Sequence, residues 1–211
     1  MKVLLVNGSP HKKGCVDAAL GIIGRTLRQD DIDSEVFWLG KKPVGGCIDC
    51  KYCKKSGACV FDDVVNEFND LARSFDGFVF GVPVYFSGVA GSMKSFMDRV
   101  FYSVPNNGED TYAYKPAAII TSARRAGTTL TLATLNQYPL YAHMPLVPSR
   151  YWNMIHGNTP EEIMEDEEGV QIMEQIGHNM AWMLKSFAAG KAAGLELPKR
   201  PLPRKYTNFI R

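Results

Sequence analysis

Short apolar runs alternate along the chain with segments whose apolar residues recur every three or four positions. The runs lack a polar alternation, which is typical of parallel strands that are buried on both faces. The predicted strands are Lys2–Asn7, Ser34–Leu39, Gly77–Val82, Pro116–Thr121 and Met144–Pro148. The alternation predicts an α/β fold, a three-layer sandwich in which helices cover both faces of a five-stranded parallel sheet.

Helix-period segments lie between and after these strands. Thr159–Glu162 combines a capping threonine, a first-turn proline and a glutamate three residues after the cap, which predicts a helix start. Gly190 is the predicted end of the last helix. The predicted helices are Val16–Leu27, Val64–Arg73, Ser92–Tyr102, one starting at Thr159–Glu162, and a last one with an apolar stripe from Val170 to Leu184.

Length and composition predict one domain and a tail. The chain has 211 residues, of which 45% are hydrophobic, enough for one buried core over residues 1–190. Residues 191–211 are predicted to form an extended arm, because prolines and basic residues follow Pro198 without periodicity. The net charge of +2 does not favour nucleic-acid binding, and no run approaches the roughly 20 apolar residues of a membrane span. We therefore expect a cytoplasmic protein with no membrane or nucleic-acid partner.

The turn Gly8–Asp17, between the first strand and the first helix, has the composition of an anion site. Unpaired amides at a helix N-terminus and the positive end of its dipole attract phosphate. The side chains of Ser9, Lys12 and Lys13 can converge on the same anion. This turn is therefore the predicted phosphate site.

Spacing excludes two other phosphate motifs. A Walker loop has four residues between its glycines, whereas five separate Gly8 from Gly14. A dinucleotide fingerprint needs a second glycine where Pro10 stands. A mononucleotide phosphate is therefore the expected ligand.

Two further loops follow the third and fourth predicted strands, whose carboxyl ends meet at the same sheet edge. Pro83–Gly88 offers two aromatic side chains and accessible amides to a flat conjugated ring. Thr121–Gly127 offers hydroxyl groups and two guanidinium groups. One phosphate, one flat ring, and positive charge where a reduced ring becomes anionic together indicate FMN.

Three segments resemble the NADPH-dependent FMN reductase family of flavodoxin-like proteins: Asn7–His11, Gly81–Tyr85 and Gly91–Arg99. Gly46–Cys53, followed by Cys59, is similar to the iron–sulfur flavoprotein branch of that family. The resemblance covers roughly the first 127 residues, the span of the three FMN loops. It implies a flavodoxin-like sheet in the order 2-1-3-4-5, bound FMN, and a homodimer or homotetramer whose subunits complete each other's flavin pockets.

The resemblance also implies which residues bind the flavin. Around the phosphate it places Ser9, His11, Gly14, Cys15 and Val16, and the charge of the turn adds Lys13. Against the ring it places Pro83, Val84, Tyr85, Phe86 and Ser87, and near the pyrimidine side Thr121, Ser122, Arg124 and Gly127. Arg124 is expected to stabilise reduced FMN and Tyr85 to shape the ring pocket, so these two are the predicted catalytic residues.

Four of the five cysteines lie within 13 residues: Cys47, Cys50, Cys53 and Cys59. Cysteines in the cytoplasm are expected to be reduced, so the cluster favours metal or redox chemistry over disulfides. The spacing suits the corners of a [4Fe–4S] cluster. Zinc also accepts four thiolates, although its sites usually come as two separated pairs, and packed thiols without metal are the third interpretation. All three stay open.

The expected function is that of an FMN-dependent oxidoreductase. It would take hydride from NADH or NADPH and pass electrons to a small acceptor such as a quinone, a flavin or a nitro compound. No side-chain acid or base is required, because the cofactor carries the chemistry. One alternative is an iron–sulfur flavoprotein that relays single electrons between FMN and a ferredoxin-like partner. Another is an FMN-binding module without turnover.

Overall fold

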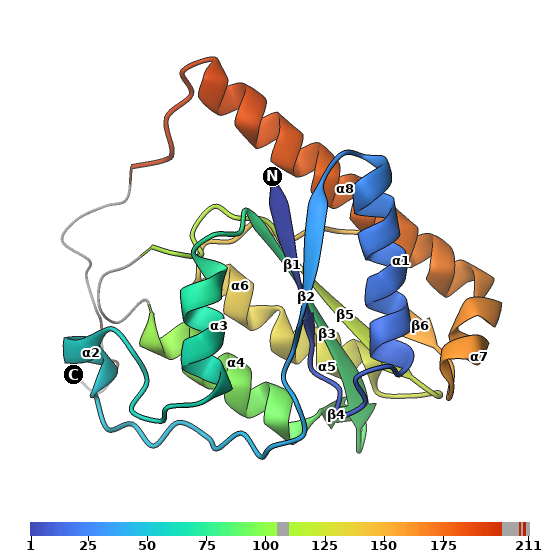
Figure 1. The fold of residues 1–211 in the computed structure, drawn as a ribbon, viewed down its shortest axis with the longest axis horizontal. Coiled ribbons are helices and arrows are strands. Elements are labelled where there is room, and N and C mark those ends of the chain that lie inside the picture. Colours follow the sequence, from blue (N-terminus) through green and yellow to red (C-terminus); the bar gives the residue numbers. More distant parts are fainter. Residues whose placement is uncertain (105–109, 200–206, 208, 210–211) are drawn as a thin grey trace.

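The structure, a computed structural model, describes residues 1–104, 110–199, 207 and 209 (Figure 1). Its strands are β1 (Lys2–Asn7), β2 (Asp33–Trp38), β3 (Gly77–Tyr85), β4 (Gly88–Val89), β5 (Ala117–Ala123) and β6 (Met154–His156). Its helices are α1 (Cys15–Gln29), α2 (Cys53–Ser56), α3 (Val64–Ala72), α4 (Gly91–Ser103), α5 (Thr128–Leu135), α6 (Gln137–Tyr141), α7 (Pro160–Glu165) and α8 (Glu167–Ala192).

The sheet has the strand order β2-β1-β3-β5-β6, and β4 pairs with the end of β3 as a short antiparallel strand. The five main strands are parallel. This is the predicted order 2-1-3-4-5, and the flavodoxin-like fold is confirmed. The inner strand β1 is an uninterrupted apolar run from Val3 to Val6 that is buried on both faces, as a parallel strand between two others must be.

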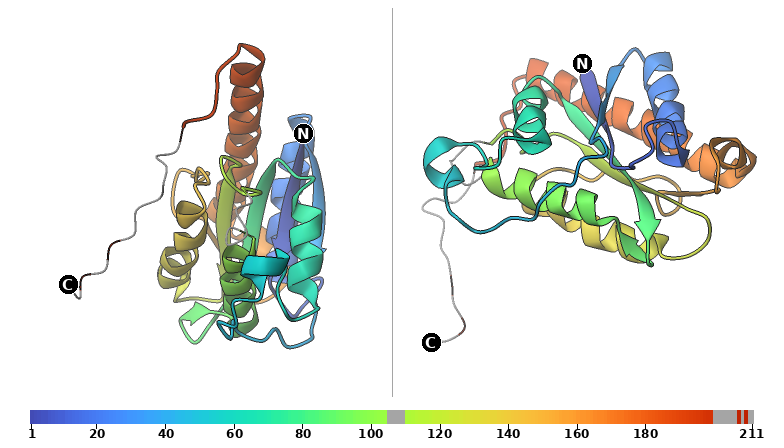
Figure 2. Two further views of the ribbon diagram at one scale, coloured as in Figure 1. Left: turned by 90° about the vertical axis from the view of Figure 1, so that its left-hand side faces the viewer. Right: turned by 60° about the horizontal axis from the view of Figure 1, so that its bottom comes forward.

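Two separate apolar cores lie on the two faces of the sheet. On one face, α1, α7 and α8 pack against the sheet through aliphatic side chains such as Ile23, Ile163 and Ile176. On the other, α3 and α4 form an aromatic core with β3, in which Phe68 packs edge-on to Phe96 at 5.0 Å between ring centroids. Figure 2 shows the helices on the two sides of the sheet. The three-layer arrangement follows from these two apolar faces.

The fifth predicted strand was wrong in position. Met144–Pro148 contacts β5 through one isolated bridge, between Leu146 and Ala117. The regular edge strand is β6, ten residues further on. Prolines at positions 145 and 148 explain the difference, because they have no N–H to donate to a strand ladder.

Two of the predicted helix starts are confirmed by their caps. The Thr159 hydroxyl accepts a hydrogen bond from the Glu162 amide at 3.3 Å, and the Asp63 carboxylate caps α3 by accepting from the Val65 amide at 3.1 Å. The short helices α2, α5 and α6 were not predicted. The last helix α8 continues past Gly190 to Ala192, so the first residues of the predicted arm 191–211 are helical. Residues 200–206, 208 and 210–211 of that arm lie outside the described residues.

None of the helices in the described ranges is both long and apolar enough to span a bilayer.

Candidate functional site

The three loops predicted to bind FMN follow β1, β3 and β5 at one edge of the sheet, at the lower end in Figure 1. They touch one another. The Gly8 amide donates to the Gly81 carbonyl at 2.9 Å, which joins the first loop to β3. A Cβ added to Gly127 would lie 2.5 Å from the Cα of Ser87, so the second and third loops are also in contact. The structure therefore brings the predicted segments together.

Hydrogen bonds to the side chains of Asn7, Ser9 and Trp38 fix the backbone of the first loop. The buried Asn7 side chain accepts from the Ser9 amide at 3.0 Å, and the Ser9 hydroxyl accepts from the His11 amide at 3.1 Å. From β2, the Trp38 indole donates to the Ser9 carbonyl at 2.8 Å. A loop fixed in this way presents its remaining groups in one arrangement, as binding a rigid anion requires.

Helix α1 begins behind this loop with Gly14 as its N-cap, and no side chain of the described residues caps it. Its first-turn amides and the positive dipole end are therefore available to an anion. His11 and Lys13 are exposed beside them. Val16 is only 2% exposed and packs in the core, so only its backbone can face a phosphate.

Cys15 lies at the first position of α1 and connects the loop to the neighbouring strands. Its thiol is 3.7 Å from the carbonyl of Gly157, which follows β6. Burial raises the pKa of this thiol, and a hydrogen bond with Ser122 opposes the shift. The group is therefore a neutral thiol at neutral pH, distant in sequence from the other four cysteines.

The second loop is a tight hairpin rather than an open loop. Strand β3 runs on to Tyr85, and β4 pairs back at Gly88. The two residues between them, Phe86 and Ser87, have positive φ angles of 48° and 57°. Two-residue hairpins with such angles usually contain Asn-Gly, so this turn stores strain of about 1–3 kcal/mol per residue. The Phe86 side chain is fully exposed, so a strained turn with an exposed aromatic ring lies beside the third loop.

The third loop has a buried base and an exposed tip. Thr121 is buried and donates to the Val82 carbonyl at 3.2 Å, and Ser122 is 5% exposed. Arg124 is exposed, and the described part of the chain gives it no carboxylate partner. Thr121 therefore supports the loop, while the Arg124 guanidinium is available to an electron-rich ligand.

A second site lies beside α2, where all four clustered cysteines line one pocket together with Arg99 and Tyr102 of α4. Cys53 is buried, Cys59 half-buried, and Cys47 and Cys50 exposed. Among the described residues, no three His, Cys, Asp or Glu side chains are close enough together to hold a metal ion. The four thiols are nevertheless the donor set of an iron–sulfur or zinc site, so the residues fit such a group by chemistry.

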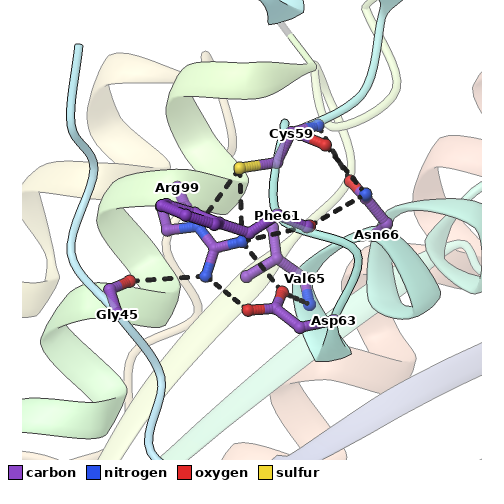
Figure 3. Close-up of polar contacts among 7 residues, drawn as sticks. All are labelled: Gly45, Cys59, Phe61, Asp63, Val65, Asn66 and Arg99. Atoms are coloured by element: carbon purple, nitrogen blue, oxygen red, sulfur yellow. Dashed lines mark hydrogen bonds and ion pairs between the residues drawn. The ribbon is translucent and has the colours of Figure 1, made fainter. Parts of the chain in front are cut away.

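Arg99 is the most connected residue of this pocket (Figure 3). Its side chain is 1% exposed, and its guanidinium forms a fork with the Asp63 carboxylate at 2.7 and 2.8 Å. It also donates to the sulfur of Cys59, from Nε and Nη2, both at 3.2 Å. Burial opposes its charge, but the bonds to Asp63 and Cys59 outweigh this effect and raise its pKa. A permanent cation therefore faces the cysteines.

Two further observations concern the loop that carries the thiols. Burial raises the pKa of the Cys53 thiol, and the charges of Cys59, Cys47 and Cys50 raise it further. Tyr102, one helical turn after Arg99, forms hydrogen bonds with Asp49 and Lys51 in the middle of the loop. Helix α4 thus holds the cysteine loop at two successive turns.

The sequence motifs contained Asn7 and Arg99, and a predicted strand contained Trp38, but no role was predicted for these three residues. Asn7 and Trp38 shape the phosphate loop, and Arg99 shapes the cysteine pocket. A signal for Arg99 was present in the helix pattern. It lies among apolar positions that become buried, including Phe96 and Val100, and a charged residue on a buried face needs a partner.

The strand order and the three contacting loops define a flavodoxin-like protein of the flavin-binding class. A family model described as NADPH-dependent FMN reductase matches residues 1–159, and the chain belongs to this family.

Individual relatives agree with this assignment. An iron-sulfur flavoprotein of Methanocaldococcus jannaschii is 26% identical over 195 residues, covering 88% of this chain and 98% of the relative. One of Clostridioides difficile is 30% identical over 129 residues, covering 60% and 56%. Among solved structures, RosB with bound 8-demethyl-8-formylriboflavin-5'-phosphate has a TM-score of 0.71 at 12% identity, covering 100% of this chain and 93% of that one. At that identity the structural likeness supports the fold alone.

Proposed function

We propose that the protein is an FMN-dependent oxidoreductase that accepts hydride from NADH or NADPH and passes the electrons to a small acceptor. The observation that carries the proposal is the contact of three loops at one sheet edge, which join the amide-rich start of α1 to the strained hairpin and the loop of Arg124. FMN supplies the hydride and electron chemistry when bound.

The protein residues have binding and tuning roles in this proposal. The backbone amides after Asn7, with Ser9 and Lys13, hold the phosphate. The hairpin residues Tyr85 and Phe86 line the pocket of the flavin ring. Arg124 favours the reduced, anionic ring through its charge. Burial raises the pKa of Cys15, so this residue contacts the loop as a neutral thiol and adds no negative charge beside the phosphate.

Anaerobic titration of the FMN-loaded protein with NADPH and, separately, NADH tests this function. We expect one of the nucleotides to bleach the flavin absorption and a quinone or a nitro compound to restore it. An FMN-loaded protein that neither nucleotide reduces is a binding module instead. The Arg124→Gln variant should retain FMN but be reduced more slowly, while loss of FMN itself would assign Arg124 to binding.

A second candidate function rests on the cysteine pocket. Four thiols lining one pocket against a buried arginine favour a [4Fe–4S] cluster on Cys47, Cys50, Cys53 and Cys59, and the relatives named iron-sulfur flavoproteins support the same group. Such a cluster exchanges single electrons and would connect FMN to a ferredoxin-like partner. Iron and sulfide analysis of anaerobically purified protein decides between the two functions, because the small-acceptor reaction needs no iron.

A further inference from the structure

Arg99 holds together the two ends of the cysteine loop. Its guanidinium donates at 3.3 Å to the carbonyl of Gly45, which precedes the first clustered cysteine. It donates at 3.4 Å to the carbonyl of Phe61, which follows the last one. Figure 3 shows the guanidinium between these two stretches of backbone. One side chain on α4 therefore closes the segment that carries all four thiols.

Cys59 is fixed at its main chain as well as at its sulfur. Its amide donates to the Asn66 side chain at 2.9 Å, and its carbonyl accepts from the same side chain at 3.0 Å. The two Arg99 bonds to the sulfur come from the opposite side, from α4. In contrast, Cys47 and Cys50 are exposed, and no bond to their sulfurs is formed within the described ranges. Cys59 is thus held in place while half of the set is free to move.

The guanidinium itself has little freedom to rotate. The Asp63 fork occupies both of its terminal nitrogens, and the Phe61 ring lies 4.9 Å from Cζ. The carbonyls of Gly45 and Phe61 and the sulfur of Cys59 accept the remaining hydrogen bonds, so each of the five N–H groups has an acceptor. Asp63 is fixed in turn, because it caps α3. The bonds to the Cys59 sulfur therefore keep one direction.

We propose that Arg99 is the positioning residue of the cysteine site: it presents Cys59 as a preformed ligand, and its hydrogen bonds to the sulfur raise the reduction potential of the bound cluster. This inference rests on the proposed [4Fe–4S] cluster. Hydrogen bonds to cluster sulfurs and nearby charge are the protein's means of setting such potentials, and donors stabilise the more negative, reduced state. Arg99 acts through Cys59 and does not touch a reactant.

The main test compares the wild type with Arg99→Lys. Lysine keeps the charge but cannot reproduce a planar fork that serves a carboxylate and a sulfur together. Both proteins are reconstituted anaerobically with ferrous iron and sulfide, and the cluster is followed by EPR during a potentiometric titration. We expect a more negative midpoint potential in the variant. We also expect an iron chelator to bleach its cluster about 10-fold faster or more, in line with the loss of other outer-shell partners.

A second variant covers the case in which Arg99→Lys does not fold. Asp63→Asn keeps an oxygen that can cap α3 but removes the carboxylate of the fork. It should make the cluster bleach faster with the chelator, by a smaller factor than Arg99→Lys, whereas the loss of one negative charge near the cluster opposes a fall in its potential. Lys51→Arg is the matched control: it conserves charge as Arg99→Lys does, and Lys51 lines the same pocket but is half exposed and bonds to Asp49 and Tyr102 rather than to sulfur. Its potential should equal that of the wild type.

The outcomes distinguish a failure of this inference from a failure of the proposed iron–sulfur cluster. A wild-type protein that takes up no iron and sulfide overturns the cluster and the inference together. A wild type that assembles the cluster, with Arg99→Lys at the wild-type potential and Asp63→Asn bleached at the wild-type rate, overturns the inference alone. Lower melting temperatures at an unchanged potential also overturn it, because Arg99 would then only stabilise the fold.

Discussion

At the sheet edge that carries the three loops, called here the flavin edge, close packing permits only glycine at certain positions. A Cβ on Gly8 would lie 2.7 Å from the Met93 sulfur and 2.9 Å from the Gly81 carbonyl oxygen, so only glycine lets α4 approach this closely. The sequence placed Gly8 at the start of the predicted phosphate turn and Gly127 among the predicted flavin-binding residues. It could not reveal which elements approach them, since Met93 is far from Gly8 in the chain and Ser87 is far from Gly127.

Replacing Gly127 with alanine is expected to disturb both stability and FMN binding. Gly127 has a φ of +94°, and an added Cβ would lie 2.5 Å from the Cα of Ser87 and 2.7 Å from Val84 Cγ1. Backbone strain and the forced movement of the hairpin should lower the free energy of unfolding by about 1–3 kcal/mol. Gly40→Ala is the control, since Gly40 has a φ of +85° but nothing within 4 Å of the added Cβ.

Urea unfolding and FMN titration measure these effects. Gly40→Ala should show only the strain of its φ angle and bind FMN as tightly as the wild type. Equal effects of the two substitutions would contradict the close approach at Gly127.

The raised pKa of Cys15 predicts a particular pH dependence of its alkylation. Burial stabilises the neutral thiol, so the reactive thiolate forms only above the ordinary value of 9.0. Modification by iodoacetamide should be slow at pH 7 and rise at more alkaline pH, and bound FMN should slow it further. Peptide mass spectrometry follows each cysteine separately. The exposed Cys50 is the internal control, and FMN that protects both cysteines equally would place the flavin elsewhere.

At the scale of elements, hydrophobic periodicity was sufficient to locate a strand or helix whose apolar residues pack against the same core along its whole length. It located β1, β3, α1 and α8, whose apolar residues meet the sheet or a helix along their length. It failed for α5, because threonine and leucine alternate over Thr128–Leu135 with a period close to that of a strand. It also missed the β3–β4 hairpin, whose Phe86-Ser87 turn lacks the usual Asn-Gly signal.

The N-terminus of α3 offers a test of the cysteine pocket as a structural unit. Asp63→Ala removes the helix cap and leaves the buried Arg99 charge without its carboxylate. An uncompensated buried charge lowers the free energy of unfolding by about 3–5 kcal/mol. Thr159→Ala removes an exposed cap on α7 and should lower it by only about 1 kcal/mol. Chemical denaturation compares the two, and similar losses would mean that Asp63 acts as a cap alone.

At the scale of the whole molecule, α4 connects the two sites. Its first turn packs against the phosphate loop, where Met93 meets Gly8, and its last turns hold the cysteine loop through Arg99 and Tyr102. Thirteen residues at about 1.5 Å each span roughly 20 Å. The sequence predicted both sites from separate motifs. That one helix carries residues of both could not be read from spacing, because the partners of Arg99 lie 36 to 54 positions away.

The flavin edge also carries apolar side chains that a second copy of the chain would cover. Phe86 is fully exposed, and Tyr85 and Leu130 are 46% and 60% exposed on the adjoining hairpin and α5. Exposed apolar patches of this kind mark interaction surfaces. We predict a homodimer or homotetramer in solution, with the hairpin in the interface, and Phe86→Glu should reduce the mass measured by light scattering and weaken FMN binding. Trp182→Glu, on the exposed face of α8, should leave both unchanged; dissociation by this variant alone would place the interface on α8.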